Sequence, residues 1–177
     1  QNAGNFARGY YEQNLREVGD ETLTMASDVR DYLNQSKISS PDFAEGYIYQ
    51  VVTRKLNRSA IIEIGSDGIV RTAATVDPDR RPVTQYLTKD IVDRLAKGEA
   101  VVVRAEPDQI QAFTLLYPGR QIYLYATRDS DAPAFSQVKR AQAVLANYES
   151  FAKQSRALQI QFNSALFIGS LALVGLA

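Results

Sequence analysis

The sequence predicts an α+β fold in which a long helix, a five-stranded antiparallel sheet and a second long helix follow one another along the chain. Between Tyr11 and Tyr32, apolar residues recur at alternating spacings of four and three, as on one face of an amphipathic helix. Between residues 59 and 128 the period changes to two, which is typical of strands. A second helical pattern begins at residue 134 and ends in a strongly apolar run.

Composition excludes several classes of site. The 177 residues are 45% hydrophobic, enough for one core of ordinary size. Twenty basic and twenty acidic residues cancel, and no long run of like charge occurs, which argues against nucleic-acid binding. The chain contains no cysteine and no histidine, so a disulfide framework, a histidine-dependent nucleophile and a histidine zinc site are all excluded.

The first helix is predicted over residues 2–36. At 1.5 Å per residue its amphipathic part is about 45 Å long, and charged residues occupy the other faces. We consider two interpretations: a stalk that packs on the C-terminal helix and on a second copy, or an ordinary helix that packs on the core. The residues of its apolar stripe are Tyr11, Leu15, Val18, Thr22, Met25, Val29 and Tyr32.

A second helix is predicted to begin at Pro41, after a Ser cap, and to run toward Asn57. Two β-branched runs follow at residues 59–65 and 69–76. The turn between them contains Asp67 and Gly68, a pair that favours a hairpin because glycine accepts positive φ angles.

A polar loop at residues 77–82 and a short helix precede the last three strands. Thr88 is predicted to cap this helix, and Gly98 to end it. Alternation then predicts strands at residues 100–105, 109–117 and 121–128.

The C-terminal helix is predicted to leave the domain and enter a membrane. Its last thirteen residues, 165–177, carry no charge and a single hydroxyl. A full span needs about 20 apolar residues, so we expect this segment to be the first part of a transmembrane helix. The alternative is a buried terminal helix of a soluble protein. The predicted divisions are thus residues 1–36, an N-terminal stalk helix; 37–133, the core that contains the sheet; 134–164, a second stalk helix; and 165–177, the start of a membrane helix.

This order of elements resembles the PAS-like sensor modules called Cache or PDC domains. Several segments are similar to the extracytoplasmic region of NtrY-type sensor histidine kinases of nitrogen regulation: SPDFAEGY, SAIIEIGSDGIV with the trailing DPDRRP, QIYLYATR, and SRALQIQFNSALFIGSLALVGLA. The resemblance covers nearly the whole chain and lies in the co-linear combination rather than in any catalytic motif.

The resemblance implies a homodimeric receptor in a bacterial inner membrane, with this domain on the periplasmic side and its stalk helices paired. Signalling modules, including the kinase and its phospho-acceptor histidine, would lie outside these residues, so the chain itself is expected to be neither an enzyme nor a cofactor carrier. Three alternatives remain open: a chemoreceptor-type ectodomain, a membrane-anchored scaffold that binds a partner protein, and a soluble enzyme.

The resemblance also implies that a small ligand binds between the sheet and residues 76–88. Arginine side chains near this segment could donate to a carboxylate or another anion, including an amino-acid-like ligand. Alternatively, they are surface charges paired with Asp77, Asp79 or Asp129. The candidates are Arg71, Arg80, Arg81 and Arg128.

Three tyrosines, Tyr86, Tyr123 and Tyr125, could line such a site with an apolar wall and a polar tip, or could simply pack on the sheet. Asp77 and Asp79 lack the further oxygen ligands and closing acid of a calcium loop, so no metal is expected.

The C-terminal helix is expected to transmit the signal. Its apolar stripe includes Val138, Leu145 and Tyr148, and Gln159 interrupts it just before the membrane run. We hypothesise two packing arrangements of similar energy that ligand binding biases. The alternative is an ordinary helix with an imperfect stripe.

Overall fold

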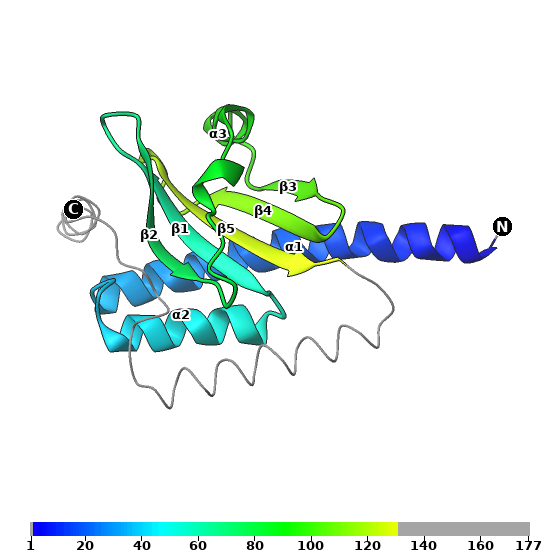
Figure 1. Cartoon of the computed structure of the whole chain (residues 1–177), viewed down its shortest axis with the longest axis horizontal. Helices are drawn as coiled ribbons and strands as arrows, with labels where there is room; N and C mark the ends of the chain where they lie inside the picture. Colours follow the sequence, from blue (N-terminus) through cyan, green and yellow to red (C-terminus); the bar gives the residue numbers. More distant parts are fainter. Residues whose placement is uncertain (1, 131–177) are drawn as a thin grey trace.

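The structure is a computed structural model that describes residues 2–130, with side chains from residue 8 onward (Figure 1). The predicted elements at residues 134–164 and 165–177 lie outside the described residues. The elements in chain order are α1 (Asn2–Gln35), α2 (Pro41–Thr53), β1 (Arg58–Ile64), β2 (Val70–Val76), η1 (Thr84–Tyr86), α3 (Lys89–Ala96), β3 (Val102–Ala105), β4 (Gln109–Leu115) and β5 (Ile122–Asp129).

The five strands form one antiparallel sheet in the order β2-β1-β5-β4-β3, which confirms the predicted α+β architecture. Helices α1 and α2 pack on one face, and η1 and α3 pack on the other (Figure 1). Strands β1 and β5 lie at the centre and are covered on both sides, so their polar residues must find partners inside the protein.

The first helix packs on the sheet through its predicted stripe. Val18, Met25 and Val29 are fully buried in the core under β4 and β5. Towards its N-terminus α1 extends past the edge of the sheet, and Tyr10 and Tyr11 are about 40% exposed (Figure 1). The second half of α1 is therefore a core helix, while contacts of its first half with a stalk partner remain a prediction.

Helix α2 begins as predicted. The Ser40 Oγ accepts a hydrogen bond of 3.1 Å from the amide of Phe43, and Pro41 occupies the first turn. The helix ends at Thr53, earlier than expected, because Lys55 adopts a left-handed backbone conformation (φ 57°) that turns the chain into β1.

The hairpin prediction is confirmed, with Gly68 at φ 77° and the amide of Gly65 donating to the carbonyl of Ile69. Thr88 occupies the N-cap position of α3, but its hydroxyl makes no capping hydrogen bond. The single turn η1 was not predicted, because three residues are too short to show a helical period.

Within residues 2–130, no helix combines the length and the apolar character that crossing a membrane requires. The face under α1 and α2 is a large apolar core. The opposite face, under η1 and α3, holds a smaller apolar cluster that gives way to polar side chains near the start of β1.

Candidate functional site

The site lies on the face of the sheet covered by η1 and α3. Half of this face is aromatic and apolar. Tyr125 of β5 lies between Phe113 of β4, with ring centroids 5.0 Å apart, and Tyr86 of η1, which stacks on it at 5.9 Å and an interplanar angle of 12°. Tyr123 packs one row further along the same face. These rings form an apolar wall.

The next row of the sheet is polar. The strand register places Arg58 of β1 directly opposite Thr127 of β5, and Thr127 directly opposite Gln111 of β4. We call these three residues the polar row. Arg58 is 4% exposed, and the other two are fully buried. Because partners in register point to the same face, the three side chains lie side by side.

Arg58 is held in its charged form by acidic partners. Its Nη2 donates to Asp129 Oδ1 at 2.5 Å and to Gln109 Oε1 at 2.8 Å, and its Nη1 lies 3.3 Å from Asp79 Oδ2. Burial alone would lower the pKa of the guanidinium. The charge and hydrogen bond of Asp129, with the charge of Asp77, outweigh burial and raise the pKa above its ordinary value.

Each member of the polar row has a buried polar atom without a hydrogen-bond partner in the described structure: Arg58 Nε, Gln111 Oε1 and Thr127 Oγ1. Such atoms are rare in folded proteins, and each costs about 1–3 kcal/mol. Three of them in one row, on three neighbouring strands, form a set of a donor, an acceptor and a hydroxyl that could bind one small polar molecule.

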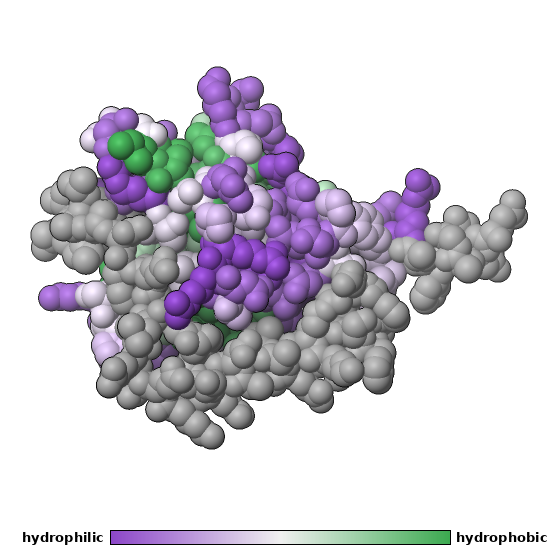
Figure 2. Space-filling view, in the orientation of Figure 1, coloured by the Kyte–Doolittle hydropathy of each residue, from purple (hydrophilic) through white to green (hydrophobic). Residues whose placement is uncertain are grey.

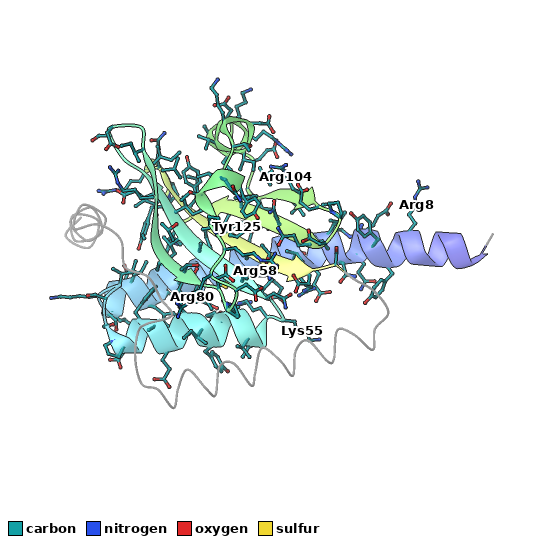
Figure 3. The ribbon with its side chains drawn as sticks, viewed as in Figure 1. Arg8, Lys55, Arg58, Arg80, Arg104 and Tyr125 are labelled. Carbon is teal, nitrogen blue, oxygen red and sulfur yellow. The ribbon has the colours of Figure 1, made fainter. Side chains whose placement is uncertain are left out.

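Tyr125 joins the wall to the polar row. Gln111 Nε2 lies 3.5 Å from its hydroxyl oxygen. Burial raises the pKa of Tyr125 well above its ordinary value, and the nearby Arg58 charge offsets this only in part. The phenol therefore stays protonated at neutral pH. Figure 3 shows Arg58 and Tyr125 together over the sheet, with Arg80 on the loop outside them.

The loop after β2 covers this end of the site. Asp77 stabilises the turn of this loop, because its two carboxylate oxygens accept hydrogen bonds from the amides of Asp79 (2.8 Å) and Arg81 (2.5 Å). Asp77 is buried, whereas Asp79, Arg80 and Arg81 are exposed. Figure 2 shows hydrophilic surface over this loop and hydrophobic surface around the β1–β2 hairpin.

The structure brings together the three predicted tyrosines, Tyr86, Tyr123 and Tyr125, on one face. It places Arg80 in the covering loop, exposed and at φ 52°. The predicted signal-transmission residues lie outside the described residues.

Arg71 and Arg128 do not lie with the three tyrosines. Arg71 lies at the hairpin, where its guanidinium pairs with both carboxylate oxygens of Asp67 at 3.2 and 2.6 Å. Arg128 points to the opposite face, donates to the carbonyls of Arg54 and Lys55, and pairs with Glu17 of α1 at 3.2 Å. Arg128 therefore ties β5 to the two helices.

Sequence reasoning missed Arg58, Gln109 and Gln111. The predicted first strand began one residue late and left Arg58 outside it. In the observed strand Arg58 is in phase with Ala60 and Ile62, so it shares their buried face. Gln109 and Gln111 alternate with apolar residues in the same way. This alternation in phase with buried apolar residues was the sequence signal that could have identified the three residues.

The acidic side chains of the site are occupied by backbone amides and arginines. Among residues 2–130, no group of three or more acidic, histidine or cysteine side chains could hold a metal ion.

Comparison with known proteins identifies the chain. The family model of the NtrY N-terminal region matches residues 1–172, nearly the whole sequence, and confirms the resemblance to NtrY-type kinases. No curated protein matches the chain. The chain therefore belongs to the NtrY N-terminal region family, the non-catalytic sensor part of NtrY-type kinases of nitrogen-regulating two-component signalling.

Proposed function

We propose that this chain is a PAS-like, ligand-sensing domain on the periplasmic side of a bacterial inner membrane, and that it controls a histidine kinase encoded beyond these residues. One observation carries the proposal: three buried polar atoms of Arg58, Thr127 and Gln111, without hydrogen-bond partners among the described residues, lie in a single row of the sheet. A small molecule bound there would satisfy all three.

The architecture supports a PAS-like module. The connection between β2 and β3 carries η1 and α3 and covers the sheet face opposite α1. A ligand between this connection and the sheet would touch Tyr86, Tyr125 and the polar row. Pockets with an apolar wall and a few convergent polar groups are typical of small-molecule sites.

The chemistry of the row favours a small anionic or amino-acid-like ligand. The guanidinium of Arg58 is a forked donor suited to carboxylates, and Gln111 and Thr127 add an amide and a hydroxyl. The stacked rings of Tyr86 and Tyr125 would contact the apolar part of such a ligand.

Transmission would start at the end of β5. Asp129 pairs with Arg58 on the ligand face, and the adjacent Arg128 pairs with α1 on the other face. We propose that a ligand shifts these last residues of the strand, and that paired stalk helices of a homodimer carry the shift through Val138, Leu145, Tyr148 and Gln159 to a membrane helix beginning near Ala165.

Cysteine crosslinking at Leu145 and Tyr148 in membranes tests this transmission. The crosslinking pattern should differ between signalling states, because the two packing arrangements bring different residues together across the dimer. Identical patterns in every state would remove the transmission proposal and leave ligand binding standing.

A membrane-anchored scaffold for a partner protein is the second candidate. The apolar packing around Tyr123 favours it, because that half of the face is filled by side chains of the domain itself. The exposed Ile69 at the hairpin tip, 54% accessible, would suit a protein contact. A chemoreceptor-type ectodomain would share the ligand site and differ only in its output.

Thermal-shift screening against amino acids, organic acids and inorganic anions tests ligand binding. A specific ligand raises the melting temperature by linkage. Thr127→Val keeps the side-chain shape but removes a hydroxyl that has no hydrogen-bond partner within residues 2–130. It should therefore leave the unliganded protein as stable or slightly more stable. It should also abolish the ligand-induced shift.

Thr24→Val is the matched control, because the Thr24 hydroxyl donates to the carbonyl of Asp20 within α1, on the opposite side of the sheet from the polar row. It should retain the full shift. Two results would contradict the proposed site and favour the scaffold. One is that no compound raises the melting temperature of the wild-type protein; the other is that a compound raises that of Thr127→Val equally.

A further inference from the structure

The two ion pairs of Arg58 differ in how firmly they are built. Asp129 belongs to β5, its amide donates to Asn57 Oδ1 at 2.7 Å, and its carboxylate lies 2.5 Å from Arg58 Nη2. Asp79 belongs to the loop, lies 3.3 Å from Arg58 Nη1, and has a side chain 53% exposed. Asp129 is thus a fixed partner, whereas Asp79 reaches Arg58 from outside the sheet.

The loop keeps its shape without the Asp79 carboxylate. Its closing hydrogen bonds are accepted by Asp77 from the amides of Asp79 and Arg81. The Asp79 carboxylate also has a second partner, Arg81 Nη2, at 3.5 Å. On leaving Arg58 it would therefore reach water and a neighbouring cation, and no charge would be left buried without compensation.

Arg58 offers more donors than Asp79 uses. Asp79 contacts one nitrogen, and Arg58 Nε has no partner in the described structure although the residue is 4% exposed. A carboxylate that is free to orient could bond to more than one nitrogen of the guanidinium, which is the stronger arrangement. Thr127, next to Arg58 in the row, and Gln111 on the far side of Thr127 could contact the remainder of such a molecule.

We propose that the Asp79 carboxylate occupies the position where the guanidinium of Arg58 would bind a ligand, and that the natural ligand is a small carboxylate. This ligand displaces Asp79 and frees the exposed residues 79–82 from the sheet. This inference rests on the proposed ligand-sensing function and adds the class of ligand and the contact that opposes it.

The balance of charges around Arg58 favours a carboxylate ligand. Replacing the Asp79 carboxylate by a ligand carboxylate leaves the net charge beside Arg58 unchanged. Adding an anion without displacing Asp79 would crowd a fourth carboxylate beside those of Asp77, Asp79 and Asp129. A cationic ligand would instead face the buried guanidinium.

A tethered competitor lowers the apparent affinity for the ligand in proportion to the time it occupies the site. Removing its charge should restore the intrinsic affinity. The probe is acetate, the smallest stable organic carboxylate with an apolar carbon. It is titrated into the 177-residue chain in detergent micelles, and the NMR signal of the Arg58 Nε–H proton is followed because that proton belongs to the site alone.

Asp79→Asn should bind acetate about tenfold more tightly than the wild-type chain, on the order expected when the competent state is a minor one. Asp67→Asn is the matched control: it removes the same charge from an arginine pair at the hairpin, away from the site. It should bind acetate as the wild-type chain does.

Equal or weaker acetate binding by Asp79→Asn would overturn the inference that Asp79 occupies the ligand position, while leaving the ligand-sensing function standing. Acetate that moves the Arg58 signal in neither chain would overturn the carboxylate class. The function itself is judged separately, by the Thr127→Val screen. Because Asp79 is exposed, its variant should fold, and the dispersion of its amide spectrum checks this.

Discussion

Arg58 carries a full positive charge into the protein interior, with a side chain only 5% exposed. Its Nη2 is satisfied by Asp129 and Gln109, but its Nε is not satisfied within the described structure. A buried ion pair adds little net stability, yet removing one partner leaves an uncompensated charge. At the scale of single residues, the site is therefore sensitive to loss of Asp129.

Asp129→Asn should lower the free energy of unfolding by about 2 kcal/mol, below the usual range for a broken buried pair because the asparagine oxygen can still accept a hydrogen bond. Chemical denaturation measures this change. Asp67→Asn, which breaks a solvent-exposed pair, should change the free energy of unfolding far less. Equal losses in the two variants would show that Arg58 does not depend on Asp129.

Among the elements, the β1–β2 hairpin is held by a local ion pair that has its own pH dependence. Hydrogen bonds from Arg71 and from the amide of Ile69 lower the pKa of Asp67 from 3.8 to about 2. The folded pKa is the lower one, so the pair stabilises the hairpin fully above the ordinary pKa. That stabilisation is lost as the pH falls toward the folded value.

A carboxyl-carbon NMR titration of Asp67 in the folded domain should give a midpoint near pH 2, and the Arg71→Gln variant should move it toward 3.8. A wild-type midpoint already near 3.8 would mean that the pair seen at the hairpin does not persist in solution.

The elements were largely predictable from the sequence, because period and turn chemistry are local. The change of period at residue 59, the Asp67-Gly68 turn and the Ser40 cap placed helices and strands to within a few residues.

The site was less predictable. Tyr86 and Tyr125 were identified as candidates, but Arg71 and Arg128 lie at other places because their positions depend on strand register and on which face a residue occupies. Arg58 was missed because the burial of a charged residue is set by partners distant in sequence, Gln109 and Asp129.

At the scale of the whole molecule, the sheet separates two roles. The face under α1 and α2 is a filled apolar core, and Arg128 joins that face to Glu17. The opposite face holds the polar row, and Asp129, the last residue of β5, forms an ion pair with Arg58 of that row. Two adjacent residues at the end of β5 therefore connect the proposed ligand site with the long helix, just before the chain passes to residues 131–177.

A crystal structure of the chain with the strongest compound from the thermal-shift panel tests whether the polar row binds a small ligand. One ligand should lie over the sheet, within hydrogen-bond distance of Arg58 Nε, Gln111 Oε1 and Thr127 Oγ1. Ordered water bonded to these three atoms, with the compound bound elsewhere, would contradict it.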